Sequence, residues 1–175
     1  MDHHFLNSSY REKLIEHLFV GELLKLSWAN KEFSLEVSKP EVDNSGYDLI
    51  AEARGFIRHI QLKTAFLGAK TASQTVHTAL AKKPSGCVVW VYFHPDTLRL
   101  GPFLYFGGVR GEHLPSLEKM KIARHTKGNS SGTKSERPNI RSIPKGQFVA
   151  LPNIESLFTI LFGSAPVKSI SKTNS

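Results

Sequence analysis

One short run of residues limits the folds open to this chain more than any other feature. Residues 87–93 read Cys-Val-Val-Trp-Val-Tyr-Phe, an almost unbroken series of β-branched and aromatic side chains. Such a run is typical of a central strand that is buried on both faces of a sheet. It is far shorter than the roughly 20 apolar residues that a membrane-spanning helix requires. The sequence therefore predicts a globular protein built around a sheet, without a membrane partner.

The length and the cysteine content limit the class of protein further. A chain of 175 residues is long enough for one hydrophobic core. We expect a single domain over residues 1–163 and a disordered polar tail over residues 164–175. The sequence contains one cysteine, Cys87, which excludes an intramolecular disulfide and a cysteine-ligated zinc cluster. This cysteine usage, and an N-terminus that does not read as a secretion signal, lead us to expect a cytoplasmic protein.

Positive charge is concentrated in one segment. The formal net charge is +8, and residues 119–145 hold eight basic side chains against the single acid Glu136. The middle of this segment reads Gly-Asn-Ser-Ser-Gly-Thr, so we expect a flexible loop. A solvated loop that keeps the protein soluble and a loop that binds a polyanion are both compatible with this composition. The residues expected to contact nucleic acid are Lys119, Lys121, Arg124, Lys127, Lys134, Arg137 and Arg141.

Hydrophobic periodicity predicts the order helix, three strands, helix, strand, followed by C-terminal additions. This order indicates an α/β (α+β) fold, with a central mixed sheet flanked by helices. The elements of the first part are expected at residues 10–27 (helix), 33–37, 47–54 and 56–65 (strands), 72–83 (helix) and 87–93 (strand). The additions are expected at residues 98–106 (strand), from 115 (short helix), at 147–151 (strand) and at 153–163 (helix).

Polar side chains of the two strands over residues 47–65 are expected to share one face. A two-residue turn at 54–55 or at 55–56 can join these strands, and residue 48 then pairs with residue 61 or with residue 63. Because alternate residues of a strand point to the same face, either register brings Asp48, Gln61 and Lys63 together. These side chains are costly to desolvate, and a hard divalent cation held by oxygen ligands would offset that cost.

A carboxylate on the first helix is expected to join this group. At about 100° per residue, Glu22 falls near the middle of the apolar stripe of the helix, whereas Glu12 and Glu16 fall toward its edge or beyond. A carboxylate in an apolar face must be paired, coordinated or protonated. Lys63 or a metal ion is the natural partner of Glu22.

Two motifs that follow the acid-bearing helix resemble those of a known family. The segments Gly-Tyr-Asp-Leu-Ile at 46–50 and Ile-Gln-Leu-Lys-Thr at 60–64 are similar to the motifs of the restriction-endonuclease-like nucleases of the PD-(D/E)xK superfamily. The resemblance is narrower to the QxK variants, in which glutamine replaces the second acid. The family core has the order αβββαβ, which is the order expected here for residues 10–93. The resemblance therefore implies a restriction-endonuclease-like core with C-terminal additions.

The resemblance also implies roles for individual residues. Asp48, Gln61 and the main-chain carbonyl of Leu62 would bind Mg²⁺, for which Mn²⁺ can substitute, Lys63 would be the catalytic lysine, and Glu22 would be the helix acid of the catalytic set. The implied activity is that of a metal-dependent endodeoxyribonuclease that hydrolyses phosphodiester bonds with metal-activated water. The implied partner is nucleic acid, double-stranded or branched DNA, and a homodimer is compatible with this function.

Two alternatives to a nuclease stay open at this point. Because Gln61 is neutral, the chain could be a nuclease-fold module that binds nucleic acid without cleaving it. It could also be an interaction protein whose basic loop docks an acidic partner protein. Divalent-metal binding and DNA binding at low salt distinguish the three hypotheses.

Overall fold

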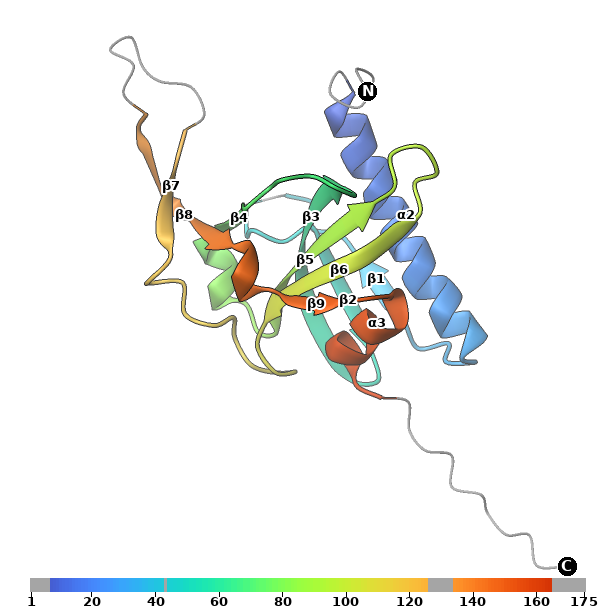
Figure 1. Cartoon of the computed structure of the whole chain (residues 1–175). Coiled ribbons are helices and arrows are strands. Elements are labelled where there is room, and N and C mark those ends of the chain that lie inside the picture. Colours follow the sequence, from blue (N-terminus) through green and yellow to red (C-terminus); the bar gives the residue numbers. More distant parts are fainter. Residues whose placement is uncertain (1–6, 43, 126–133, 165–175) are drawn as a thin grey trace, which may run out of the picture.

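The computed structural model describes residues 7–42, 44–125 and 134–164, and its centre is a six-stranded sheet (Figure 1). The strand order is β1-β2-β3-β5-β6-β9, in which β3 and β5 run parallel and the other neighbours run antiparallel. The prediction of a mixed α/β fold with a central mixed sheet is therefore confirmed. The strands are β1 (Glu36–Ser38), β2 (Leu49–Ala53), β3 (Phe56–Phe66), β5 (Gly86–Phe93), β6 (Leu100–Gly107) and β9 (Val149–Leu151).

Different layers cover the two faces of this sheet. The helices α2 (Ser8–Ala29) and α3 (Ile154–Phe162) pack on one face, where Phe19 and Leu161 belong to the same core as Val89. A three-stranded sheet of order β4-β8-β7 covers the other face. Its strands are β4 (Ser73–His77), β8 (Glu136–Pro144) and β7 (Lys121–Arg124). In the described part of the chain, no helix combines the length and apolar character that crossing a membrane requires.

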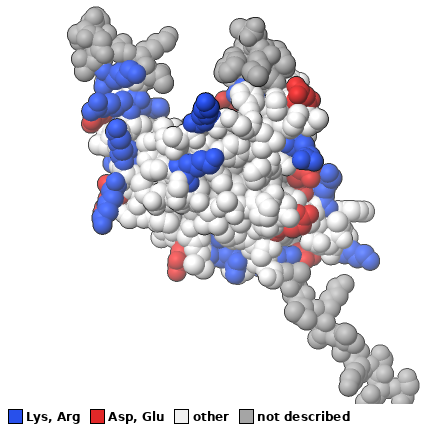
Figure 2. Space-filling view, in the orientation of Figure 1, with Lys and Arg blue, Asp and Glu red and all other residues white. Residues whose placement is uncertain are grey.

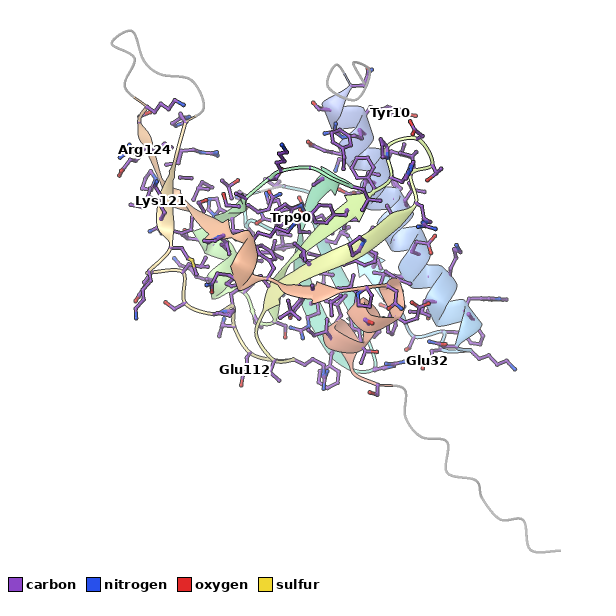
Figure 3. All side chains as sticks on the ribbon, viewed as in Figure 1. Tyr10, Glu32, Trp90, Glu112, Lys121 and Arg124 are labelled. Atoms are coloured by element: carbon purple, nitrogen blue, oxygen red, sulfur yellow. The ribbon has the colours of Figure 1, made fainter. Side chains whose placement is uncertain are left out.

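The strand β5 is the central buried strand that the sequence predicted. Every residue of β5 is buried, and its side chains alternate between the two cores. Val89 and Val91 belong to the core under the helices, whereas Trp90 and Tyr92 belong to the core between the two sheets. Figure 3 labels Trp90. Burial raises the pKa of Cys87 to about 12, so its thiol stays protonated at neutral pH.

The turn between β2 and β3 selects one of the two predicted registers. Ala53 pairs with Phe56, so the two-residue turn is 54–55. Both turn residues have positive φ angles, 54° and 76°, as the type I′ turn that suits a tight hairpin requires. Leu49 consequently pairs with Ile60, which puts residue 48 opposite residue 61.

The two strands of this hairpin have unequal lengths. The last paired residue of β2 is Leu49, opposite Ile60, whereas β3 continues to Phe66. Beyond Ile60, β3 pairs only with β5 among the described strands. Over its last six residues, 61–66, one edge of β3 therefore has no paired strand among the described residues, and side chains can approach the backbone there.

Two of the predicted helices are wrong. The segment predicted as a helix over residues 72–83 forms β4 and a short 3₁₀ helix, Thr78–Lys82. Thr75 and Val76 are β-branched, and they pair with β8, which lies far along the chain. This pairing overrides the local helical pattern. The described residues after Pro115 contain no helix before β7.

Part of the predicted basic flexible loop forms strands, and for that part the prediction is wrong. Residues 121–124 and 136–144 form β7 and β8, which pair antiparallel. Lys127 and the Gly- and Ser-rich middle of the segment lie outside the described residues. We call residues 119–125 and 134–145 the basic arm, which projects beyond the central sheet (Figure 1). The predicted tail also lies outside the described residues except for Ser164, and the extent of the domain stays a prediction.

A buried arginine joins α3 to the central sheet. Arg58 of β3 is fully buried, and its guanidinium donates hydrogen bonds to the carbonyls of Leu161, Ile160 and Gly108 at 2.9, 3.1 and 3.4 Å. The carbonyls at the C-terminal end of a helix lack partners within the helix, and positive charge is favourable there. Arg58 therefore stabilises the end of α3 against the sheet, a role that the sequence pattern did not indicate.

We expect Arg58→Met to lower the free energy of unfolding by about 2–3 kcal/mol, because it leaves buried carbonyls without a donor. Urea denaturation followed by circular dichroism measures this change. Arg99→Met, at an exposed position, is the control and should change stability by about 0.5 kcal/mol or less. Equal stability of the two variants would contradict the proposed role of Arg58.

Candidate functional site

A polar cavity lies where β2 ends and β3 continues. Its lining comes from the N-terminal half of α2, the residue before β2, the open part of β3, and β4. We call it the site cavity. Its lining includes Glu16, Asp48, Gln61, Leu62, Lys63 and Gln74.

Asp48, Gln61 and Lys63 all line this cavity. Asp48 Oδ2 accepts a hydrogen bond from the Leu62 amide at 2.7 Å. The main-chain amide of Asp48 donates to the carbonyl of Ile60 at 2.8 Å. Because these bonds fix both the backbone and the carboxylate of Asp48, its carboxylate is held against the open edge of β3.

The neutral oxygens of β3 complete a set of oxygen donors. Gln61 Oε1 is buried and has no hydrogen-bond partner among the described residues. The N–H and C=O of one strand residue point to the same side, so the Leu62 carbonyl is directed to the edge where its amide meets Asp48. Carboxylate, amide and carbonyl oxygens are ligands that suit Mg²⁺. These residues fit a hard divalent cation.

Acidic ligands are few at this site. Among the residues that the structure describes, no group of three or more His, Cys, Asp or Glu side chains could hold a metal ion. A cation in the site cavity would therefore depend on Gln61 and the Leu62 carbonyl as well as on carboxylates. Mg²⁺ tolerates such a set because it keeps several waters and often completes its coordination with substrate phosphates.

The helix carboxylates that line the site cavity are Glu12 and the buried Glu16, and the predicted Glu22 lies elsewhere. Glu22 is partly exposed, pairs with Lys25 at 2.9 Å, and lines a different pocket beside α3. Glu16 and Glu22 are six residues apart, which separates them by about 120° around the helix. The covered side of α2 carries Glu16, Phe19, Leu23 and Ser27, so it is rotated away from Glu22.

Glu16 is held by two lysines. Its side chain is 8% exposed and pairs with Lys13 at 3.1 Å and also with Lys39, which follows β1. Burial raises the pKa of Glu16, but hydrogen bonds and positive charge from Lys39 and Lys13 outweigh burial and bring this pKa below its ordinary value. Glu16 is therefore ionised at neutral pH and adds a negative charge to the side of the cavity formed by α2.

A second hollow adjoins the site cavity and shares two residues with it. Gln61 and Lys63 line both spaces, and the second space extends toward β4 and the basic arm. We call it the adjoining hollow. Its described lining is Asn44, Gly46, Gln61, Lys63, Thr75, His77, Arg137 and Ile140.

The basic arm brings the predicted nucleic-acid contacts to one side of the molecule. Lys and Arg side chains gather on the arm with few acidic side chains among them (Figure 2). Among the members of this set that the structure describes, Arg137 alone lines the adjoining hollow. Arg124 pairs with Glu136 at 3.4 Å, and Arg141 donates to the carbonyl of Pro138 at 2.6 Å. Lys119, Lys121 and Lys134 are exposed, and Lys127 lies outside the described residues. Figure 3 shows Lys121 on the arm.

A close contact fixes the backbone that leads into Asp48. Gly46 has a φ of +75°, and a Cβ atom added there would lie 2.7 Å from the Cβ of His77. The Nδ1 atom of His77 accepts a hydrogen bond from the amide of Ala79 at 3.0 Å. The contact of His77 with Gly46 joins residues far apart in sequence, so it could not be read from local spacing.

Comparison with known proteins gives a structural likeness but no match in sequence. No protein-family model matches the chain, and no curated protein matches it. The chain is similar to the solved structure of a bacterial homing endonuclease, I-Ssp6803I, with 19% sequence identity and a TM-score of 0.31. The match covers 70% of this chain and 85% of that chain. A likeness of this extent leaves the function of this chain to be argued from its own residues.

We expect Gly46→Ala to destabilise the protein more than Gly55→Ala. Both positions have positive φ, 75° and 76°, so both variants incur about 1–2 kcal/mol of backbone strain. The added methyl group meets nothing within 4 Å at Gly55 but meets His77 at Gly46. Repacking should cost Gly46→Ala about 1–3 kcal/mol more. Urea denaturation of both variants measures the difference, and equal midpoints would show that the contact with His77 is unimportant.

Proposed function

We propose that this protein is a Mg²⁺-dependent endonuclease that hydrolyses phosphodiester bonds of DNA. One observation carries the proposal: Asp48, Gln61 and Lys63 converge from a strand end and its neighbour into one polar cavity. A carboxylate, a neutral oxygen donor and an ammonium group at one site suit metal-assisted hydrolysis of a phosphate ester. Arg137 of the basic arm lines the adjoining hollow, which shares Gln61 and Lys63 with this cavity, so the arm adds a means of binding the polyanionic substrate.

The residues proposed to hold the metal ion are Asp48, Gln61 and the main-chain carbonyl of Leu62. When bound, Mg²⁺ would lower the pKa of a coordinated water and neutralise negative charge on the phosphate. The hydrogen bond from the Leu62 amide orients the Asp48 carboxylate before any ligand arrives. Buried Gln61 Oε1 has no partner among the described residues, so coordination would compensate its desolvation.

Lys63 is proposed to act on the reacting phosphate. Its side chain lines both the site cavity and the adjoining hollow. An ammonium group in this position can orient the attacking water and stabilise the negative charge that develops on the phosphate oxygens. In the proposed reaction, Asp48 helps to hold the metal ion, and Lys63 stabilises negative charge on the phosphate.

A nucleic-acid-binding module without catalysis is the second candidate. It is favoured by the neutral Gln61 and by the ion pairs of Glu16 with Lys13 and Lys39. These features leave the site with fewer carboxylates directed to a metal ion than a set of two or three acids would provide. In this hypothesis, the basic arm binds DNA in the same way, but divalent ions add no stability.

We expect Lys63→Ala to abolish cleavage of supercoiled plasmid in Mg²⁺ or Mn²⁺, because it removes charge stabilisation in the transition state. EDTA should also abolish cleavage by the unmodified protein. Thermal midpoints should stay within a few degrees. Lys70→Ala, at an exposed lysine that does not line the site cavity, is the matched control and should cleave normally.

Full cleavage by the Lys63→Ala protein would rule out this assignment of the active site. The companion variant Asp48→Asn should lose cleavage and bind Mg²⁺ more weakly, because it removes the carboxylate charge while it keeps an oxygen for the Leu62 amide. Calorimetry of Mg²⁺ binding gives this result separately from activity. If neither the unmodified protein nor the Asp48→Asn variant binds Mg²⁺ and both bind DNA, the module without catalysis is the correct function.

We expect Gln61→Glu to tighten Mg²⁺ binding and to preserve cleavage, because it adds an anionic oxygen at a ligand position. Gln74→Glu adds the same charge to the same cavity from β4, so it controls for general electrostatic attraction. Isothermal calorimetry with Mg²⁺ compares the two variants. An equal gain in both variants, or none in Gln61→Glu, would show that Gln61 is not a ligand.

A further inference from the structure

The adjoining hollow differs from the site cavity in its balance of charge. The site cavity is lined by three carboxylates and three cations, Glu12, Glu16, Asp48, Arg11, Lys13 and Lys63, whereas none of the described residues that line the adjoining hollow is acidic. Two of them, Lys63 and Arg137, are cations. The hollow thus combines positive charge with polar side chains, which suits an anion.

The polar groups of the hollow include donors from separate elements. Thr75 and His77 lie two residues apart on β4 and therefore share a face, and Asn44 lies in the segment before β2. Because His77 Nδ1 accepts the Ala79 amide, the neutral ring carries its proton on Nε2, which makes that atom a donor. A hydroxyl, an amide, a ring N–H and two cations can surround one tetrahedral anion.

The backbone holds this arrangement before any ligand binds. His77 pairs with Ile140 of β8, so the strand that carries Arg137 is hydrogen-bonded to the strand that carries Thr75 and His77. The close approach of Gly46 fixes His77 from the other side. Strand pairing therefore holds the backbone under Thr75, His77 and Arg137 in place before a ligand binds.

We propose that the adjoining hollow binds a second phosphodiester group of the nucleic-acid strand, next to the one at the site cavity. The proposal rests on the proposed function, which assigns the reacting phosphate to the site cavity. Lys63 lies between the two phosphates, since it lines both spaces. Arg137 neutralises the second phosphate, Thr75 and His77 donate hydrogen bonds to it, and the rest of the basic arm continues the contact outward.

A strand phosphate suits the hollow better than a free phosphate for two reasons. The hollow is continuous with the site cavity through Gln61 and Lys63, so neighbouring phosphates of one strand can occupy both. The basic arm extends from Arg137 and offers exposed cations to further phosphates. A free phosphate would use neither feature. The occupant is accordingly a phosphate that belongs to a chain.

Two variants test the second phosphate through different properties of binding. Fluorescence anisotropy with a fluorescein-labelled DNA duplex in EDTA measures affinity without cleavage. Arg137→Gln should reduce the slope of log K against log salt by about 0.9, the effect of one phosphate contact. Thr75→Val keeps a β-branched residue in β4 and removes a neutral donor. It should weaken binding about 2- to 12-fold and leave the slope unchanged.

The controls separate the hollow from general electrostatics. Arg99→Gln removes an exposed cation that lines neither the site cavity nor the adjoining hollow, and it should leave the slope unchanged. An unchanged slope with Arg137→Gln overturns the proposal. Thermal stabilisation by inorganic phosphate that disappears in Arg137→Gln, with no change in the DNA slope, also overturns it and identifies a site for free phosphate.

The cleavage and binding experiments together distinguish an error in the second phosphate site from an error in the proposed nuclease function. If the protein cleaves plasmid while Arg137→Gln and Thr75→Val bind DNA as the unmodified protein does, the second phosphate site is wrong and the nuclease stands. If both variants change binding as expected and no metal ion supports cleavage, the second phosphate site stands on a binding module.

Discussion

The register of one short hairpin determines the geometry of the site. The two-residue turn 54–55 requires positive φ at both positions, and this turn sets Asp48 opposite Gln61. A slip of one residue would move every side chain of the strand to the other face, so Asp48 would enter the core under the helices. Because β2 ends at Leu49 and β3 continues, the polar residues of β3 have open space beside them. The same hairpin therefore creates both the convergence of side chains and the cavity they occupy.

Charge is divided across this space in a way that suits a phosphate ester. Carboxylates and cations both line the site cavity, whereas the described lining of the adjoining hollow has cations and no acid, and Lys63 belongs to both spaces. Glu16 keeps its negative charge because Lys13 and Lys39 favour its ionised form. The carboxylates of the site cavity offer oxygens to a cation, and the positive charge of the adjoining hollow attracts a polyanion. The arrangement results from two different layers of the fold meeting at one edge of the central sheet.

The parts of the site that could be predicted are those that follow from local periodicity. The parity of Asp48, Gln61 and Lys63 depends only on the alternation of a strand, and the buried run at 87–93 depends only on composition. Periodicity favours Glu22 over Glu16, because it shows that the helix has an apolar side but not which residues of the helix the sheet covers. The prediction of a helix at 72–83 is wrong because part of this segment forms β4, which pairs with β8 more than sixty residues away in sequence. Arg58 was missed because its partners at the end of α3 are equally remote.

The neutral Gln61 has a consequence for how metal and substrate would bind under the proposed function. Asp48, Gln61 and Lys63 together carry no net charge, whereas an acid in place of Gln61 would leave one negative charge on the set. A site with so little negative charge attracts Mg²⁺ weakly by itself, and phosphate oxygens of the substrate would supply the missing anionic ligands. Binding of metal and of nucleic acid would then be mutually reinforcing, since each ligand raises the affinity for the other by the same factor. The basic arm and the adjoining hollow gain importance in this arrangement, because they hold the strand whose phosphate completes the metal site.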